Sequence, residues 1–148
     1  MEKSLVLIKP DAVQRGVAGE IISRLERKGL KIVAMRMLQM DEPMARRHYA
    51  IHEGKAFFDD LVHFITSGPI IAIVFQGNNA VAAVRQMTGA TDPAKAQTGT
   101  IRGDLGMDIG HNLIHGSDSL ENASAEIDLF FTADDILSYD RDTDRWIY

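Results

Sequence analysis

The run Ile70-Ile71-Ala72-Ile73-Val74-Phe75 decides the fold class, because it is the clearest β-strand signal in the sequence. Its residues are mostly β-branched, none is charged, and the run is long enough for a strand of ordinary length. Gly68-Pro69 before it and Gly77-Asn78-Asn79 after it are typical of turns. A buried strand therefore lies near the middle of the chain.

Three further runs predict strands that accompany this one. Leu5–Ile8 is short, apolar at successive positions and bounded by Pro10, which is typical of a fully buried strand. Leu30–Met40 is rich in Ile, Val and Met and alternates in part, and Ile127–Phe131 is the last apolar run before a mostly polar tail. The sequence thus predicts four strands.

Helical patterns occupy most of the chain between the predicted strands. The expected helices begin at an Asp11 N-cap and end at Lys28-Gly29, begin at Asp41-Glu42-Pro43, run from about Phe57 to Ser67, cover Ala80–Met87, extend from a Ser119 N-cap to Ala125 or Glu126, and form a last turn over Thr132–Leu137. Four strands with helices between them indicate an α+β sandwich, one sheet with helices on a face. Periodicity alone does not give the order of the strands.

Composition excludes several classes of protein. The chain has 148 residues, which suits a single domain over residues 1–148, and its 45% hydrophobic and 25% charged residues are ordinary for a globular protein. It has no cysteine, which excludes a disulfide framework and thiolate chemistry and fits a cytoplasmic location. A net charge of −5 disfavours nucleic acid as a partner, and no apolar run is long enough for a membrane span.

Two glycine-punctuated runs, Gly99–Gly106 and Gly110–Ser119, form a long stretch with little helical or strand period. A loop of this length within a small chain is usually functional or disordered. Its Ile101, Leu113 and Ile114 argue against disorder, because a solvated linker has no use for them. The stretch therefore predicts a functional loop.

His115 is the candidate for the chemistry of this loop. An arbitrary histidine is more often held by turn backbone groups, but Asn112 and Ser117 can orient this ring, and Gly116 allows a ligand to approach closely. A neutral imidazole is a competent nucleophile when one nitrogen is free and the other is held by a hydrogen bond. Glu126 can supply that hold, directly or through Ser117.

Other readings of these residues stay open from spacing alone. His111 and His115 have the spacing of half a zinc site, although a glycine beside each histidine and the lack of a cysteine pair make a metal site the weaker reading. Lys9 follows the first strand and Arg102 lies in the glycine-rich loop, so both suit a phosphate group, whereas Arg85 reads equally as a solvated helix residue. The P-loop, dinucleotide and nucleophile-elbow motifs are absent.

The run Asn112-Leu113-Ile114-His115-Gly116-Ser117-Asp118 resembles the active-site signature of the nucleoside diphosphate kinase family, whose histidine carries the phosphoryl group. Further motifs resemble that family in the same order along nearly the whole chain: Ile8–Val13, Tyr49, His52, Phe57-Phe58, Ser67–Pro69, Gly99–Asp104 and Trp146–Tyr148. Three positions depart from the common pattern, namely Ala56 and Thr98 in place of proline and Phe130 in place of tryptophan. The first two remove a fixed φ from their loops.

The resemblance implies a ferredoxin-like βαββαβ sandwich with a four-stranded antiparallel sheet. It implies ping-pong transfer of the γ-phosphoryl group from a nucleoside triphosphate to a nucleoside diphosphate through a phosphohistidine on His115, supported by Glu126 and Ser117. The residues that it places against the nucleotide are Lys9, Tyr49, Phe57, Leu61, Arg85, Thr91, Arg102 and Asn112. Phe57 would stack on the base with Leu61 beside it, which gives broad base and sugar tolerance.

The resemblance also implies partners. Mg²⁺ would arrive on the nucleotide phosphates rather than on protein ligands. The chain would form a homo-oligomer, and the Trp146–Tyr148 tail favours a hexamer over a tetramer. The alternative from another class is a non-catalytic, nucleotide-binding regulatory module on the same fold, which would keep Lys9, Phe57 and Arg102 but has no need of His115.

Overall fold

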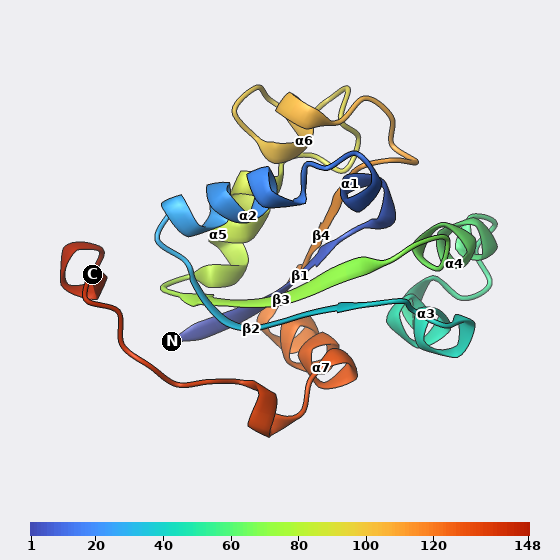
Figure 1. Ribbon diagram of the computed structural model, residues 1–148. Coiled ribbons are helices and arrows are strands. Elements are labelled where there is room, and N and C mark those ends of the chain that lie inside the picture. Colours follow the sequence, from blue (N-terminus) through green and yellow to red (C-terminus); the bar gives the residue numbers. More distant parts are fainter.

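The computed structural model, which describes all 148 residues, contains one four-stranded sheet with helices on both faces (Figure 1). The strands are β1 (Glu2–Ile8), β2 (Lys31–Leu38), β3 (Ile70–Gly77) and β4 (Ile114–Gly116). They lie in the order β2-β3-β1-β4, and every neighbouring pair is antiparallel. The α+β fold and the antiparallel four-stranded sheet that we predicted are confirmed.

The helices divide between the two faces of the sheet. They are α1 (Pro10–Gln14), α2 (Ala18–Arg27), α3 (Glu42–His48), α4 (Phe58–Ile65), α5 (Ala80–Thr88), α6 (Ile101–Leu105) and α7 (Leu120–Phe130), with 3₁₀ turns η1 (Ala50–His52), η2 (Ala133–Asp135) and η3 (Asp144–Trp146). Figure 1 shows α2 and α5 over one face and α7 over the other, with α3 and α4 beyond the strand ends. None of the helices has the length and hydrophobicity that a membrane-spanning segment requires.

The position of β1 between two cores explains why Leu5–Ile8 is apolar at every position. Leu5 and Leu7 belong to the core that includes α3, α4 and α7, whereas Val6 and Ile8 belong to the core that includes α2 and α5. Because successive side chains of a strand point to opposite faces, a strand that is covered on both faces needs apolar residues at every position. β1 therefore runs between the two cores, and Lys9 comes directly after its last residue, Ile8.

The last strand was predicted in the wrong place. Ile127–Phe131 is not a strand, because α7 continues through Phe130 and packs Ile127 and Phe130 into one core. Apolar residues three apart fit a helix face as well as a short apolar run fits a strand. The fourth strand is instead β4, which lies inside the predicted loop and pairs Leu7 of β1 with His115.

Two details near the loop also differ from the prediction. The glycine-rich run contains the short helix α6, whose N-cap Thr100 accepts a hydrogen bond from the backbone N–H of Gly103. Asp11 is not an N-cap, because α1 begins at Pro10. Its carboxylate accepts a hydrogen bond from the backbone N–H of Leu113 at 3.0 Å, which fastens the residue before β4 to α1. The predicted N-cap Ser119 is confirmed, and the helix predicted to begin at Asp41-Glu42-Pro43 is α3, with Asp41 as its N-cap.

Candidate active site

A cleft of about 930 Å³ opens at the end of β1, between α3 and α4 on one side and α5 on the other. The sequence-predicted residues that line it are Lys9, Tyr49, Phe57, Leu61, Arg85, Thr91, Arg102, Asn112, His115 and Glu126. They come from segments that are far apart in the chain, and the fold brings all of them into one cavity. Ser117 is the exception, since it is fully buried behind the cleft wall.

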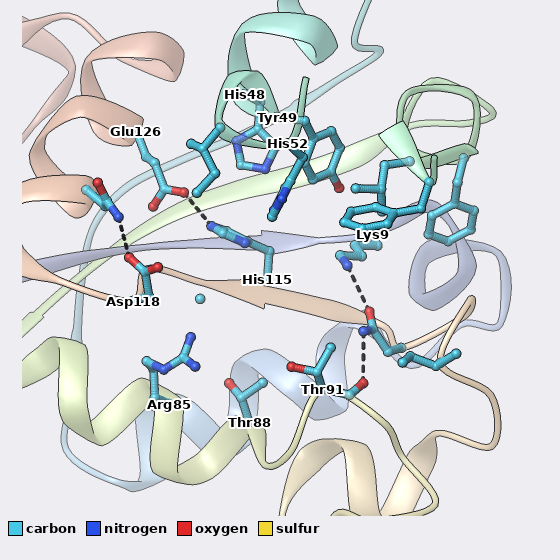
Figure 2. Close-up of a pocket in the computed structure, with 18 of the residues that line it drawn as sticks. Lys9, His48, Tyr49, His52, Arg85, Thr88, Thr91, His115, Asp118 and Glu126 are labelled. Carbon is cyan, nitrogen blue, oxygen red and sulfur yellow. Dashed lines mark hydrogen bonds and ion pairs between the residues drawn. The ribbon is translucent and has the colours of Figure 1, made fainter. Parts of the chain in front are cut away.

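His115 lies on β4, and its ring is held from behind by a carboxylate (Figure 2). Its Nε2 is 2.7 Å from Oε2 of Glu126, a residue of α7. Oε1 of the same carboxylate accepts a hydrogen bond of 2.7 Å from the Ser117 hydroxyl. That hydroxyl oxygen accepts in turn from the backbone N–H of Leu5 at 3.0 Å. A series of hydrogen bonds therefore fixes the ring to the central strand of the sheet.

This arrangement selects the ring tautomer of His115. A carboxylate oxygen accepts hydrogen bonds, so Nε2 carries the proton and donates it to Glu126. A neutral imidazole then has its lone pair on Nδ1, which has no hydrogen-bond partner in the protein. Chemically, the neutral form of this ring can act through Nδ1 as a nitrogen nucleophile, with a carboxylate placed to stabilise positive charge on the ring.

Lys9 is buried at the floor of the cleft. Its Nζ donates a hydrogen bond of 2.8 Å to Oδ1 of Asn112, and Nδ2 of Asn112 donates to the Thr91 carbonyl at 3.1 Å. Burial, followed by the positive charge of Arg102, lowers the pKa of Lys9 to about 8. The charged form of this ammonium group is disfavoured by its burial, so a bound anion would stabilise it.

The two arginines have different surroundings. Arg102 is buried and donates to the carbonyls of Asn112 and Gly89 at 3.1 Å and of Ile114 at 2.5 Å. Burial and then the charge of Arg85 lower the pKa of Arg102 to about 10. Three of the N–H donors in its guanidinium thus tie the loop together, and two of the five remain for a ligand. Arg85 stands on α5, across the cleft from His115 in Figure 2.

Aromatic and apolar side chains line the mouth of the cleft. The Phe57 ring is 46% exposed, which is unusual for a phenylalanine, and its centroid is 5.3 Å from that of His52. Leu61 lies one helical turn further along α4. Tyr49 is buried, its hydroxyl has no partner, and burial raises its pKa to about 12. An exposed aromatic ring at the mouth of a cleft provides a platform for a planar ligand.

Sequence reasoning missed His48, the last residue of α3. Its ring lies edge-on to His115, with centroids 4.8 Å apart and planes at 83°. Neither of its buried ring nitrogens has a hydrogen-bond partner. Burial, with the charges of His115 and Lys9, lowers the pKa of His48 well below its usual range. The only signal in the sequence was its place beside Tyr49, which does not distinguish a cleft residue from a solvated one.

The suggested histidine pair is not formed. His111 is exposed, packs edge-on against Phe64 with centroids 5.3 Å apart, and belongs to no cluster of metal-ligating side chains. The cluster that does exist combines His48, His115 and Glu126. Asp118 also lines the cleft, and its hydrogen bond from Asn122 keeps the pKa of its carboxyl below the usual range.

Comparisons with known proteins give one consistent result. The family model described as nucleoside diphosphate kinase matches residues 2–136. A nucleoside diphosphate kinase from Roseiflexus sp. (strain RS-1) is 57% identical over 148 residues, which is 100% of this chain and 99% of that protein. Another from Carboxydothermus hydrogenoformans is 52% identical with the same coverage.

Solved structures agree with the sequence relatives. The structure of a halophilic nucleoside diphosphate kinase from Halobacterium salinarum in complex with CDP superimposes with a TM-score of 0.97 at 53% identity. That match covers 99% of this chain and 98% of the other. A nucleoside diphosphate kinase family protein from Babesia bovis superimposes with a TM-score of 0.96 at 39% identity, over 100% of both chains.

Proposed function

The chain belongs to the nucleoside diphosphate kinase family and transfers the γ-phosphoryl group of a nucleoside triphosphate to a nucleoside diphosphate; from this premise we propose that Nδ1 of His115 carries the phosphoryl group between the two half-reactions. The observation that carries this proposal is the 2.7 Å contact between His115 Nε2 and Glu126, which holds the ring through Nε2 and leaves Nδ1 without a hydrogen-bond partner. A fixed, neutral nucleophile is what transfer to nitrogen requires.

In the first half-reaction, the Nδ1 lone pair attacks the γ-phosphorus in line with the leaving diphosphate. The bond from the γ-phosphorus to the β–γ bridging oxygen breaks, and its electron pair stays on the diphosphate. Because Nε2 keeps its proton, the phosphorylated ring becomes positively charged, and the Glu126 carboxylate stabilises that charge as it develops. A second nucleoside diphosphate reverses these steps in the same cleft, which gives ping-pong kinetics.

The cationic residues of the cleft hold the phosphates. Burial lowers the pKa of both Lys9 and Arg102, because neither charged group has an anionic partner close enough to offset its loss of hydration. An incoming polyphosphate would supply that partner. Arg85 approaches from the opposite wall, and Thr91 and Asn112 offer polar groups near Lys9. Such a transfer depends on positioning and charge neutralisation more than on covalent chemistry.

The mouth of the cleft holds the base. We propose that Phe57 stacks on the base with Leu61 beside it and that Tyr49 contributes its hydroxyl. A ring face reads no base identity, so purines and pyrimidines bind alike. The Halobacterium salinarum relative was solved in complex with CDP, which supports a nucleotide as the ligand of this chain.

The family uses a divalent cation, and we propose that this ion is Mg²⁺ and that it enters on the nucleotide phosphates as part of the substrate. The residues of the cleft fit that role better than they fit a resident Mg²⁺ ion. Mg²⁺ prefers oxygen ligands, whereas the one cluster of metal-ligating groups here contains two imidazoles and a single carboxylate.

We also propose a homo-oligomer, and a hexamer rather than a tetramer. Two features support self-association: β2 is an edge strand with Met35 and Met37 exposed by 55% and 60%, and Trp146 is 79% exposed. The hexamer rests on the resemblance of the C-terminal tail alone. Light scattering of the purified chain would give its mass and separate six subunits from four.

Labelling with γ-³²P-ATP in the absence of an acceptor tests the proposed nucleophile. We expect about one acid-labile, base-stable phosphate per chain, discharged by any nucleoside diphosphate. His115→Ala should take up no label, whereas the matched control His63→Ala, at an exposed position of α4 outside the cleft, should be labelled like the wild type. Label on the His115→Ala chain would place the nucleophile elsewhere. An unlabelled wild type that still binds nucleotide would favour a non-catalytic module.

A further inference from the structure

His48, His115 and Glu126 converge from three elements onto one point of the cleft wall. His48 ends α3, His115 lies on β4 and Glu126 lies on α7 (Figure 2). Each offers one ligand atom, and these three atoms all lie within 4.8 Å of one another. No other three metal-ligating side chains of the protein come together in this way.

His48 has no role in the proposed phosphoryl transfer. Both of its ring nitrogens are buried, and neither has a hydrogen-bond partner. Leaving a buried polar atom unpaired lowers stability, so most buried polar atoms in proteins have a hydrogen-bond partner. Here a nitrogen lone pair is kept free beside a second imidazole and a carboxylate, at the point where a cation would meet all three.

We propose that this cluster binds a zinc-like transition-metal ion and that the bound ion blocks phosphorylation of His115. Binding of the ion depends only on the three side chains. The block rests on the proposed function, because it requires His115 to be the nucleophile.

The donor set selects the class of metal. Two imidazoles and one glutamate are the ligands of a zinc site that keeps a fourth position open. Imidazole suits zinc, copper and nickel, whereas magnesium and calcium prefer oxygen ligands. Ligands at roughly 2.0–2.2 Å in a tetrahedron are about 3.3–3.6 Å apart, so closing this cluster around an ion needs side-chain movement of about 1 Å. The Ser117 hydroxyl already orients the carboxylate from behind.

Metal and phosphoryl group exclude each other because a neutral imidazole has a single lone pair. If the ion takes Nε2 of His115, the ring proton moves to Nδ1 and the nucleophile is lost. If the ion takes Nδ1, the attacking atom itself is occupied. Conversely, the phosphorylated ring bears phosphorus on one nitrogen and a proton on the other, which leaves no lone pair for a metal. Lys9, on the floor of the same cleft, opposes the ion by charge repulsion and favours the polyanionic substrate.

Zinc titration of the nucleotide-free chain against a zinc-binding dye tests the site directly. We expect about one Zn²⁺ per chain, and His48→Gln should weaken that binding by about tenfold or more. The matched control His63→Gln, an exposed histidine outside the cluster, should bind like the wild type. Equal binding by His48→Gln and the wild type, or no binding by the wild type at millimolar zinc, would overturn the proposal.

The phosphorylated wild type gives a second test that needs no variant. The chain is labelled with ATP, freed of nucleotide by gel filtration, and titrated with zinc. We expect loss of the zinc site after phosphorylation, and its return after discharge with a nucleoside diphosphate and a second filtration. In the reverse order, zinc bound beforehand should slow labelling at least tenfold, and EDTA should restore it. Equal zinc binding by both forms contradicts the exclusion, whereas a chain that takes no label contradicts the proposed function and leaves the zinc titration standing.

Discussion

Replacing Lys9 by methionine should stabilise the protein while it removes activity. The ammonium group of Lys9 is buried between Arg102, which repels it, and the Asn112 amide, to which it donates at 2.8 Å. A fall in its pKa from 10.5 to about 8 means that the folded chain holds the charged form at a cost. Methionine keeps most of the length of the side chain and carries no charge.

The size of the effect follows from two opposing contributions. A pKa of about 8 instead of 10.5 means that the charged Lys9 lowers the free energy of unfolding by about 3 kcal/mol at pH 7, since each unit of pKa difference corresponds to about 1.4 kcal/mol. Loss of the hydrogen bond to Asn112 lowers the free energy of unfolding of the variant by about 1.5 kcal/mol. The net gain of Lys9→Met is therefore about 1.5 kcal/mol in the free energy of unfolding. For a chain of this length, that gain raises Tm by about 3–6 °C.

The pH dependence of the gain identifies its cause. Between about pH 8 and 10.5, the unfolded chain keeps the Lys9 proton that the folded chain has released, so wild-type stability rises with pH in this window. The variant lacks this contribution. Its advantage should be complete below about pH 8, and above about pH 10.5 it should become a deficit of about 1.5 kcal/mol, because only the loss of the hydrogen bond to Asn112 then remains.

Thermal unfolding of the apo proteins, followed by circular dichroism at pH 7 and at pH 10.5, measures both effects. All chains are compared at one protein concentration, because association makes Tm concentration-dependent. The control is Lys95→Met at an exposed position outside the cleft, which should leave Tm within about 2 °C of the wild type. A lower Tm for Lys9→Met at pH 7, or an advantage that does not change between the two pH values, would refute the reasoning.

Three further substitutions test other parts of the site. Ser117→Ala should slow phosphorylation in rapid-quench kinetics about tenfold, because Glu126 loses one of its charge-assisted hydrogen bonds, and an unchanged rate would contradict this role. Phe57→Ala should raise KM by about tenfold to a similar extent for purine and pyrimidine nucleotides in a coupled assay, and a purine-only effect would show that the ring reads the base. Gly116→Ala should lower the free energy of unfolding in urea by about 1–3 kcal/mol, since the added Cβ would lie 2.8 Å from Cγ1 of buried Val84. An unchanged midpoint of the urea unfolding curve would show that β4 can shift to make room for the methyl group.

The parts of the fold that the sequence predicted are those with a strong local signal. Ile70–Phe75 and Leu5–Ile8 are apolar at every position because helices cover both faces of the sheet. β4 escaped prediction because it has three residues, one of them a glycine, and exists only through its pairing with β1. Ile127–Phe131 was misread because a short apolar run fits a helix face as well as a strand.

Most of the candidate site was predicted through motifs rather than periodicity. The signature around His115 predicts the loop that lines the cleft, and in the structure Glu126 contacts both His115 and Ser117, one of the arrangements that the sequence left open. His48 was missed because burial is a tertiary property: two arginines precede it, and nothing in the local sequence marks its ring as enclosed. Arg102 was found, but its bonds to three backbone carbonyls, which organise the loop, carry no sequence signal.

The cleft gathers side chains whose burial is not compensated within the protein. The atoms that the protein buries without a partner belong to Ser4, Asp11, His48 and Tyr49, and two of these residues line the cleft. Lys9 adds a buried charge to the same wall. A folded chain tolerates an unpaired buried donor, acceptor or charge where a ligand can bind to that group and stabilise it. In the proposed reaction, the phosphates of the nucleotide stabilise Lys9. At His48 no group of the proposed reaction does so, which is why a second ligand, a metal ion, is the consistent explanation of that residue.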